Sequence, residues 1–196
     1  MADCFGILAN NFLFDCDNKP SAGLETNVVI INRTDINYTT SVQSGASITN
    51  LALKPGVKKG VKLEGVKQIN TYNSELVTAD DSYDKFKHSF SGRLHQLTAT
   101  VRADIDKMSG SDAGFVVVVE KKWKGATSAS AFVVLGWKNG LFLSEGTESS
   151  AEADGGFNFT LSSKDLSLEP ENPKILLMTD YDTTATAFGN LFISGA

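Results

Sequence analysis

The sequence predicts a mainly β protein: an antiparallel β-sandwich or barrel with one packed α-helix and an extended N-terminal arm. Short apolar segments rich in β-branched residues recur along the chain, separated by Gly, Asn, Asp and Ser. One segment, residues 93–108, instead has helical periodicity. The chain has 196 residues with no internal repeat and no low-complexity linker, so a single domain spanning 1–196 is expected.

The N-terminal arm is expected to cover residues 1–25. It lacks the basic start and unbroken apolar stretch of a signal peptide, because Asn10 and Asn11 divide its apolar residues, so the chain is expected to remain in the cytoplasm where it is made. Those apolar residues could form a first strand of the sandwich or be buried against a neighbouring subunit. They are Phe5, Ile7, Leu8, Phe12, Leu13 and Phe14. In a reducing compartment, Cys4 and Cys16 are expected to be buried thiols rather than a disulfide.

Strands of the first half are recognised by their apolar runs. We expect them at residues 27–32, 36–42, 46–53, 61–69 and 70–77. The run at 27–32 is continuous, as in a strand with both faces covered. The phase of alternation shifts at Gly65, which indicates a bulge or bend. Because residues 70–77 could return antiparallel to 61–69, a long hairpin is expected near 54–78.

Strands of the second half begin with residues 115–120, the most apolar segment and the expected centre of a sheet. Further strands are expected at residues 131–137, 141–144, 157–161, 174–179 and 186–193. Asn139-Gly140 is a strong hairpin signal between two of them.

The helix is predicted from one apolar stripe. Its residues are Leu94, Leu97, Val101, Ile105 and Met108. Ser91 is expected to cap its start, and Gly110 lies just beyond its end. One face should pack on the sheet while Arg102 and the neighbouring charged residues face solvent.

Composition excludes several classes of function. Two His and two Cys are too few for a disulfide scaffold, a Cys/His zinc site or the usual iron–sulfur and haem attachments. Eighteen Lys and Arg against 23 Asp and Glu give a net charge of −5, which disfavours tight DNA or RNA binding. His88 is expected to be a half-exposed strand residue and His95 a solvent-facing helix residue. Neither belongs to a catalytic pattern, so no enzymatic activity and no cofactor are expected.

Carboxylate pairs occur at Asp15 and Asp17 and at Asp180 and Asp182. Neither pair continues into a calcium-binding loop, so they are interpreted as turn residues, and no metal site is expected. Trp123, Trp137 and Tyr181 offer an alternative of another class, a β-sandwich module that binds carbohydrate or a small ligand.

Charge is unevenly distributed along the chain. Residues 54–67 contain five lysines and one glutamate, a net charge of +4, whereas residues 144–182 contain nine carboxylates and two lysines, a net charge of −7. The two segments could be solvated hairpin faces or complementary surfaces on successive copies of the protein. In the second case Lys58, Lys59 and Lys62 join the apolar arm as candidate subunit-interface residues.

The order of elements in residues 86–193 carries a resemblance. A helix is followed by Gly114-Phe-Val-Val-Val-Val-Glu120, by Trp137-Lys-Asn-Gly-Leu141, by an acidic turn and by Phe157-Asn-Phe-Thr-Leu161. This order resembles that of the tail-tube and related tube-forming structural proteins of tailed bacteriophages. The first 85 residues match only as an arm, strands and a long hairpin.

The resemblance implies a virion structural protein. Its copies would form hexameric rings that stack into a tail tube, assembled in the host cytoplasm, with other tail or connector proteins as partners. DNA would pass through without specific binding, and no membrane would be involved. A head-to-tail connector or a tail-terminator ring is the alternative within this class.

Overall fold

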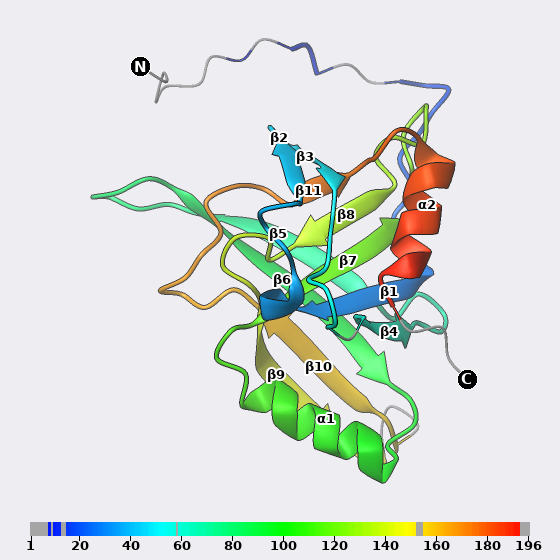
Figure 1. Cartoon of the computed structure of the whole chain (residues 1–196), viewed down its shortest axis with the longest axis vertical. Helices are drawn as coiled ribbons and strands as arrows, with labels where there is room; N and C mark the ends of the chain where they lie inside the picture. The colour runs from blue at the N-terminus through cyan, green and yellow to red at the C-terminus, as the bar shows by residue number, and fades with distance from the viewer. Residues whose placement is uncertain (1–7, 9, 13–14, 58, 152–154, 193–196) are drawn as a thin grey trace.

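Two stacked β-sheets and two short helices make up the chain in the computed structural model (Figure 1), which describes residue 8 and residues 10–12, 15–57, 59–151 and 155–192. A mixed seven-stranded sheet has the strand order β2-β3-β11-β8-β7-β1-β4, and an antiparallel four-stranded sheet has the order β5-β6-β10-β9. The predicted mainly β class is confirmed. A closed barrel is not formed, since within the described residues both sheets end in open edges.

The elements follow one another along the chain with these bounds. The large sheet contains β1 (Leu24–Asn32), β2 (Val42–Ser44), β3 (Ser47–Asn50), β4 (Val61–Glu64), β7 (Phe115–Lys121), β8 (Phe132–Leu135) and β11 (Lys174–Leu176). The small sheet contains β5 (Thr71–Val77), β6 (Lys85–Leu94), β9 (Phe142–Glu148) and β10 (Phe157–Ser162). The helices are α1 (Ala99–Ser109) and α2 (Tyr181–Asn190), with a short 3-10 turn at Arg33–Asp35.

The strands β1, β7 and β8 are buried on both faces, which explains their continuous apolar runs. Val29 of β1 pairs with Val118 of β7, and Val118 pairs with Val134 of β8. These three residues belong to an outer core that Phe188 and Leu191 cover from the C-terminal region. Their neighbours in each strand point the other way, into an inner core between the two sheets.

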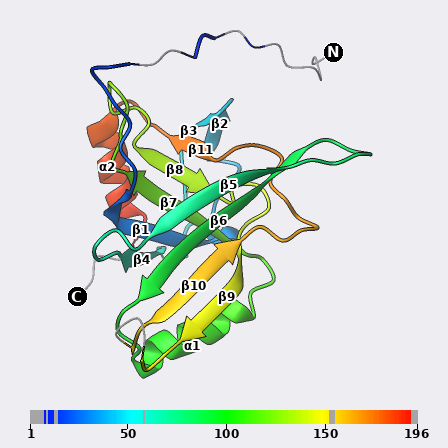
Figure 2. The ribbon, with the colours of Figure 1, turned by 180° about the vertical axis from the view of Figure 1, so that it is seen from behind.

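The small sheet buries only one face. Phe90 of β6 and Phe159 and Leu161 of β10 join the inner core. Helix α1 lies at the end of the small sheet that extends past the large sheet, on the side of β9 and β10 that faces the inner core (Figures 1 and 2). The opposite face of this sheet is exposed to solvent.

Helix α1 begins later than predicted. Residues 93 and 94 still belong to β6, because Leu94 pairs with Phe157 of β10. The cap is Thr98, whose Oγ1 accepts a hydrogen bond from the Val101 amide at 3.3 Å, and not Ser91. Gly110 follows the last residue, as predicted. None of the helix residues is fully buried, since α1 covers the end of the small sheet rather than its centre.

Helix α2 replaces the strand predicted at 186–193. Asp180 caps it, because its Oδ1 accepts a hydrogen bond from the Thr183 amide at 2.7 Å. Thr184 and Phe188 are buried one helical turn apart, and Leu191 follows on the same face. This packing against the large sheet outweighs the strand preference of the Thr and Phe residues.

Three predicted connections are wrong. Residues 36–41 form a loop, in which Ile36 makes an isolated bridge to Leu53, and only Val42 of the predicted strand is in a strand, as the first residue of β2. The predicted hairpin near 54–78 does not form, because β4 pairs with β1 whereas β5 pairs with β6. Asn139-Gly140 does not close a hairpin either. The turn carries the chain from β8 in the large sheet to β9 in the small one.

Candidate interaction surfaces

The exposed face of the small sheet is mainly polar. Since His88, Phe90 and Gly92 point inward, the alternation of the strands and their register place polar residues outward, with Val77 beside them. The polar residues include Thr71, Asn73, Glu75, Lys85, Lys87, Ser89, Ser91, Arg93, Glu145, Thr147, Asn158 and Thr160. Two of these residues are acidic and three are basic, so together they carry a net charge of +1.

Hydrogen bonds between side chains connect the strands of this face. The hydroxyl groups of Ser91 and Thr160 lie 3.0 Å apart, and Arg93 Nε donates to Asn158 Oδ1 at 2.7 Å. A shallow hollow of about 260 Å³ lies on this face, lined among others by Arg93, Glu145 and Asn158. We call the exposed face of the small sheet the polar face.

The small sheet has two edge strands, β5 and β9. Each of them is seven residues long. An open edge presents backbone N–H and C=O groups that another strand can pair with. A strand was predicted at residues 70–77, but the sequence contained no signal that β5 would lie at an edge.

A hairpin formed by β5 and β6 extends beyond the rest of the protein in both views (Figures 1 and 2). Its tip, residues 78–84, is held by a hydrogen bond from the Ala79 amide to Asp84 Oδ1 at 3.1 Å. Tyr83 is largely exposed there, and Asp80 and Asp81 precede it in the sequence. No projecting tip was predicted for residues 78–84.

The described part of the N-terminal arm lies away from both sheets (Figure 1). The side chains of Leu8 and Phe12 are 81% and 87% exposed, so neither forms a first strand of the sandwich. The arm reaches the body at Asn18, whose Oδ1 accepts a hydrogen bond from Trp123 Nε1 at 3.2 Å. Cys16 is an exposed free thiol, which contradicts the predicted burial. The other predicted residues of the arm, Cys4, Phe5, Ile7, Leu13 and Phe14, lie outside the described residues.

The basic segment 54–67 is only partly available to a partner. Lys59 is exposed, and Lys58 lies outside the described residues. Lys62 forms an ion pair with Glu64 and lies over the ring of Phe192, 5.4 Å from its centroid.

The acidic segment 144–182 is partly neutralised as well. Arg102 of α1 binds Glu148 through two hydrogen bonds of 2.7 Å, and this contact lowers the pKa of that carboxyl. Glu171 forms an ion pair with Lys174. The surface charge contrast is therefore smaller than the sequence implied.

Glu169, which precedes Pro170, is buried. Its carboxylate accepts hydrogen bonds from the amides of Lys138, Asn139 and Gly140, at 3.0, 2.7 and 3.2 Å. Burial raises the pKa of this carboxyl, and the three amide bonds oppose the rise. Its role is structural, because it fixes the turn by which the chain crosses between the sheets.

His88 is buried between the sheets, only 1% exposed, rather than half-exposed as predicted. Its Nδ1 accepts a hydrogen bond from the Gly136 amide at 3.3 Å, and burial lowers its pKa to about 4. His95 is exposed but precedes α1 and is not part of it. The two histidines are therefore not brought together in a site.

The remaining candidate residues have structural contacts. Asp15 accepts hydrogen bonds from the amides of Asp17 and Asn18, and Asp180 caps α2, so both carboxylate pairs act as turn or cap residues. Where the structure describes the chain, three or more His, Cys, Asp or Glu residues do not gather into a possible metal site.

The three aromatic residues of the ligand-binding alternative are also engaged. Trp137 is buried, and its Nε1 donates to Gln43. Lys121 lies over the ring of Trp123, 5.1 Å from its centroid. Tyr181 donates to Glu120 Oε1 at 2.6 Å and accepts a hydrogen bond from Lys124 at 2.8 Å.

A search of the described residues for helices long and apolar enough to cross a membrane finds none. Comparisons with protein-family models, with curated proteins and with solved structures give no significant match to this chain.

Proposed function

We propose that this chain is a virion structural protein whose copies form rings that stack into a tube, as the tail-tube subunits of tailed bacteriophages do, with DNA passing through. The observation that carries the proposal is the small sheet, which has one polar face and two open edges, β5 and β9. The other supports are the arm, the projecting hairpin and the resemblance described above.

The two edges suit ring formation because they are different surfaces of equal length. If β5 of one copy pairs with β9 of the next, the contact is heterologous and repeats around a ring until it closes. The polar faces of all copies would then lie on one side of a continuous sheet. A face on which acidic and basic residues nearly balance would let DNA pass without binding it tightly.

Contacts between rings would come from the parts that extend beyond the body. Leu8 and Phe12 offer apolar surface that folding of the chain leaves exposed. Pairs of surface charges are each worth only about 0–1 kcal/mol, so the arm would supply more of the interface energy than the basic segment.

A connector or terminator ring would use the same edges but would not stack repeatedly. The ligand-binding alternative has less support, since Trp123, Trp137 and Tyr181 are all engaged in contacts within the protein.

The experiment is light scattering and electron microscopy of the purified full-length chain across a range of concentrations. We expect rings or tubes, and raised salt should weaken stacking only in part. A deletion of residues 1–17 keeps the Asn18 contact with Trp123 and should remove stacking while leaving the protein folded. A strictly monomeric full-length chain at high concentration would contradict the proposal.

Edge pairing has a matched test in β5. Successive backbone N–H groups of a strand point to opposite sides, so of Asn73→Pro and Ser74→Pro only one removes a hydrogen bond to β6. The other variant should melt like the original protein and fail to form rings, because it blocks the free edge. Normal rings from both variants would exclude β5 as an interface strand.

A further inference from the structure

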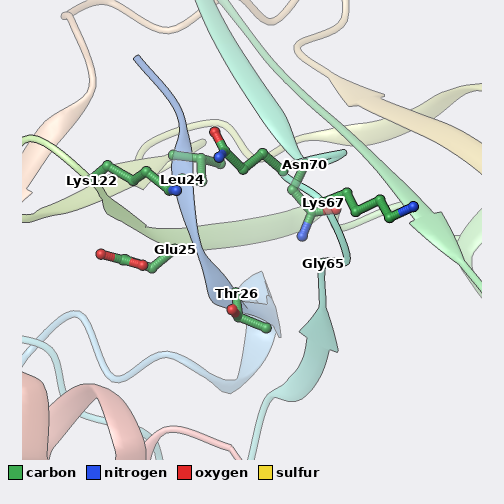
Figure 3. Close-up of a pocket in the computed structure, with 8 residues that line it drawn as sticks. Leu24, Glu25, Thr26, Gly65, Lys67, Asn70 and Lys122 are labelled. Carbon is green, nitrogen blue, oxygen red and sulfur yellow. The ribbon is translucent and has the colours of Figure 1, made fainter. Parts of the chain in front are cut away.

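A pocket of about 250 Å³ lies where β1 begins, beside the loop that joins β4 to β5 (Figure 3). Its walls are Leu24, Glu25 and Thr26 on one side, the 65–70 loop on another, and Lys122 after the end of β7. The pocket adjoins the small sheet at Asn70, the residue before β5, and its lining lies outside the polar face and outside β5 and β9. Its side chains are mainly polar.

Asn70 is the most unusual residue in this lining. Its side chain is only 2% exposed, yet neither Nδ2 nor Oδ1 has a hydrogen-bond partner among the described residues. An unpaired buried amide costs free energy, and proteins rarely retain one without a partner such as water or a ligand.

The donor end of the amide lies against Gly65, at the wall of the pocket. A Cβ atom at Gly65, which lines the pocket, would lie 2.5 Å from Asn70 Nδ2. Oδ1 has Gly92 of β6 on its other side, where a Cβ atom would lie 3.2 Å away. In Figure 3 the nitrogen of Asn70 likewise points toward Gly65. The wall of the pocket therefore contains buried N–H groups without an acceptor among the described residues.

The loop is held in an unfavourable backbone conformation. Lys67 and Gln68 have φ angles of 53° and 58°, in the left-handed region that side chains other than Gly and Asn rarely adopt. Gly23 gives room for this arrangement, since a Cβ there would lie 2.6 Å from Gln68 Oε1. Such strain is common where a loop forms part of a binding site.

Charge in the lining is positive. Lys67 and Lys122 have no ion pair in the described part of the chain, whereas the carboxylate of Glu25 lies 3.7 Å from Lys124 Nζ. Figure 3 shows Glu25 turned away from the other side chains and Lys122 lying beside Leu24, with Lys67 extending outward. Ammonium and amide donors without acceptors favour a ligand that is negatively charged and rich in oxygen.

We propose that this pocket binds a carboxylate or another small oxyanion, with Asn70 Nδ2 and Lys122 Nζ as the principal donors. The anion can come from two sources, a free small molecule or an Asp or Glu side chain of a second copy. The proposal does not require ring assembly, so it stands or falls separately from the proposed function.

The test is a titration of the ¹⁵N-labelled full-length chain with sodium acetate, and separately with inorganic phosphate, at constant ionic strength set with sodium chloride. We expect saturable shifts of the amide signals of residues 24–26, 65–70 and 122. Lys122→Gln should weaken binding about tenfold, as loss of a charged donor does. Lys54→Gln, an exposed lysine outside the pocket, is the matched control.

Asn70→Ala should abolish the saturable shifts, but it alters a buried residue, so its melting temperature must be measured alongside. Lys122 is exposed, so Lys122→Gln should fold and keeps the test valid if Asn70→Ala does not fold. Absence of saturable shifts, or equal affinity in Lys122→Gln and the original protein, would overturn the proposal.

Light scattering of the same samples distinguishes the two sources. If acetate lowers the assembly size and Lys122→Gln does the same, the natural anion is a side chain of a second copy. If assembly is unchanged while the shifts saturate, the natural anion is a free molecule. Both results support the oxyanion site, and a monomeric chain with saturable shifts would overturn only the ring proposal.

Discussion

The two sheets of this protein differ in how many faces they bury. The large sheet is covered on one side by the small sheet and on the other by α2 and the loops around β2 and β3. The small sheet shares only the inner core, and its other face meets solvent. Most of the buried apolar side chains therefore belong to the large sheet, whereas the small sheet has a solvent-exposed face and two long edge strands.

This difference separates stability from function along the chain. A change in β7 or β8 affects two cores at once, so it should act on folding first. A change on the polar face or at the edges of the small sheet should leave folding nearly intact and act on association. The predictions below test that separation, in order of decreasing effect on stability.

Val118→Asp should have the largest effect. Val118 is fully buried in the outer core, between partners in β1 and β8, so an aspartate there would be an unpaired buried charge. We expect a loss of more than about 4 kcal/mol, enough to unfold a marginally stable domain. Asn73→Asp on the polar face should change stability by no more than about 0.5 kcal/mol. Comparable urea midpoints for the two variants would show that the sheets do not differ as described.

Acid should destabilise the inner core through His88. Its pKa is lowered from 6.5 to about 4, so between these values the unfolded chain binds more protons than the folded one. His88 leaves the free energy of unfolding unchanged above about pH 6.5 and lowers it progressively as the pH falls to about 4. At 1.36 kcal/mol per unit, the loss amounts to about 3 kcal/mol.

Glu169 acts in the opposite direction. The pKa of its carboxyl is raised, so protonation on lowering the pH favours the folded state and offsets part of the His88 effect. Urea unfolding from pH 7 to pH 4 measures the sum. His88→Gln should reduce the loss of stability over this range, and an unchanged pH profile in that variant would assign the acid sensitivity to other groups.

Val101→Asp should lower the stability less than Val118→Asp or the acid titration of His88. The sequence predicts a helix face buried against the sheet, but Val101 is only half-buried because α1 covers the end of the small sheet. We expect a loss of about 1 kcal/mol, measured against Ala103→Asp on the exposed side of the same helix. A loss as large as that of Val118→Asp would mean that α1 packs in a true core.

Sequence reasoning was most successful where one local pattern determines the structure. The runs at Val28–Ile31 and Val116–Val119 predicted fully buried strands, because few other settings accept four consecutive apolar residues. The apolar stripe around Val101 and Ile105 predicted a helix, although its start was placed six residues too early. Asp180 and the spacing of Thr184, Phe188 and Leu191 also contained a helix signal, which the abundance of Thr and Phe obscured.

What could not be predicted depends on contacts between distant segments. Nothing near Glu169 in the sequence indicates that its carboxylate accepts hydrogen bonds from three backbone amides of a turn about 30 residues earlier. The same holds for Asn70, whose amide is packed against Gly65 and against Gly92 of β6. Strand pairing was also missed, since β4 and β5 are neighbours in sequence but belong to different sheets.

The place of β11 in the large sheet has a consequence for synthesis on the ribosome. β11 lies between β3 and β8, and the α2 region that follows it covers the outer core. Until residues 174–192 have left the ribosomal exit tunnel, the apolar outer-core side of β7 and β8 has no cover, and β3 and β8 have no strand between them. A nascent chain paused at that stage would expose apolar surface, so we expect prompt docking of residues 174–192 to protect the protein from aggregation.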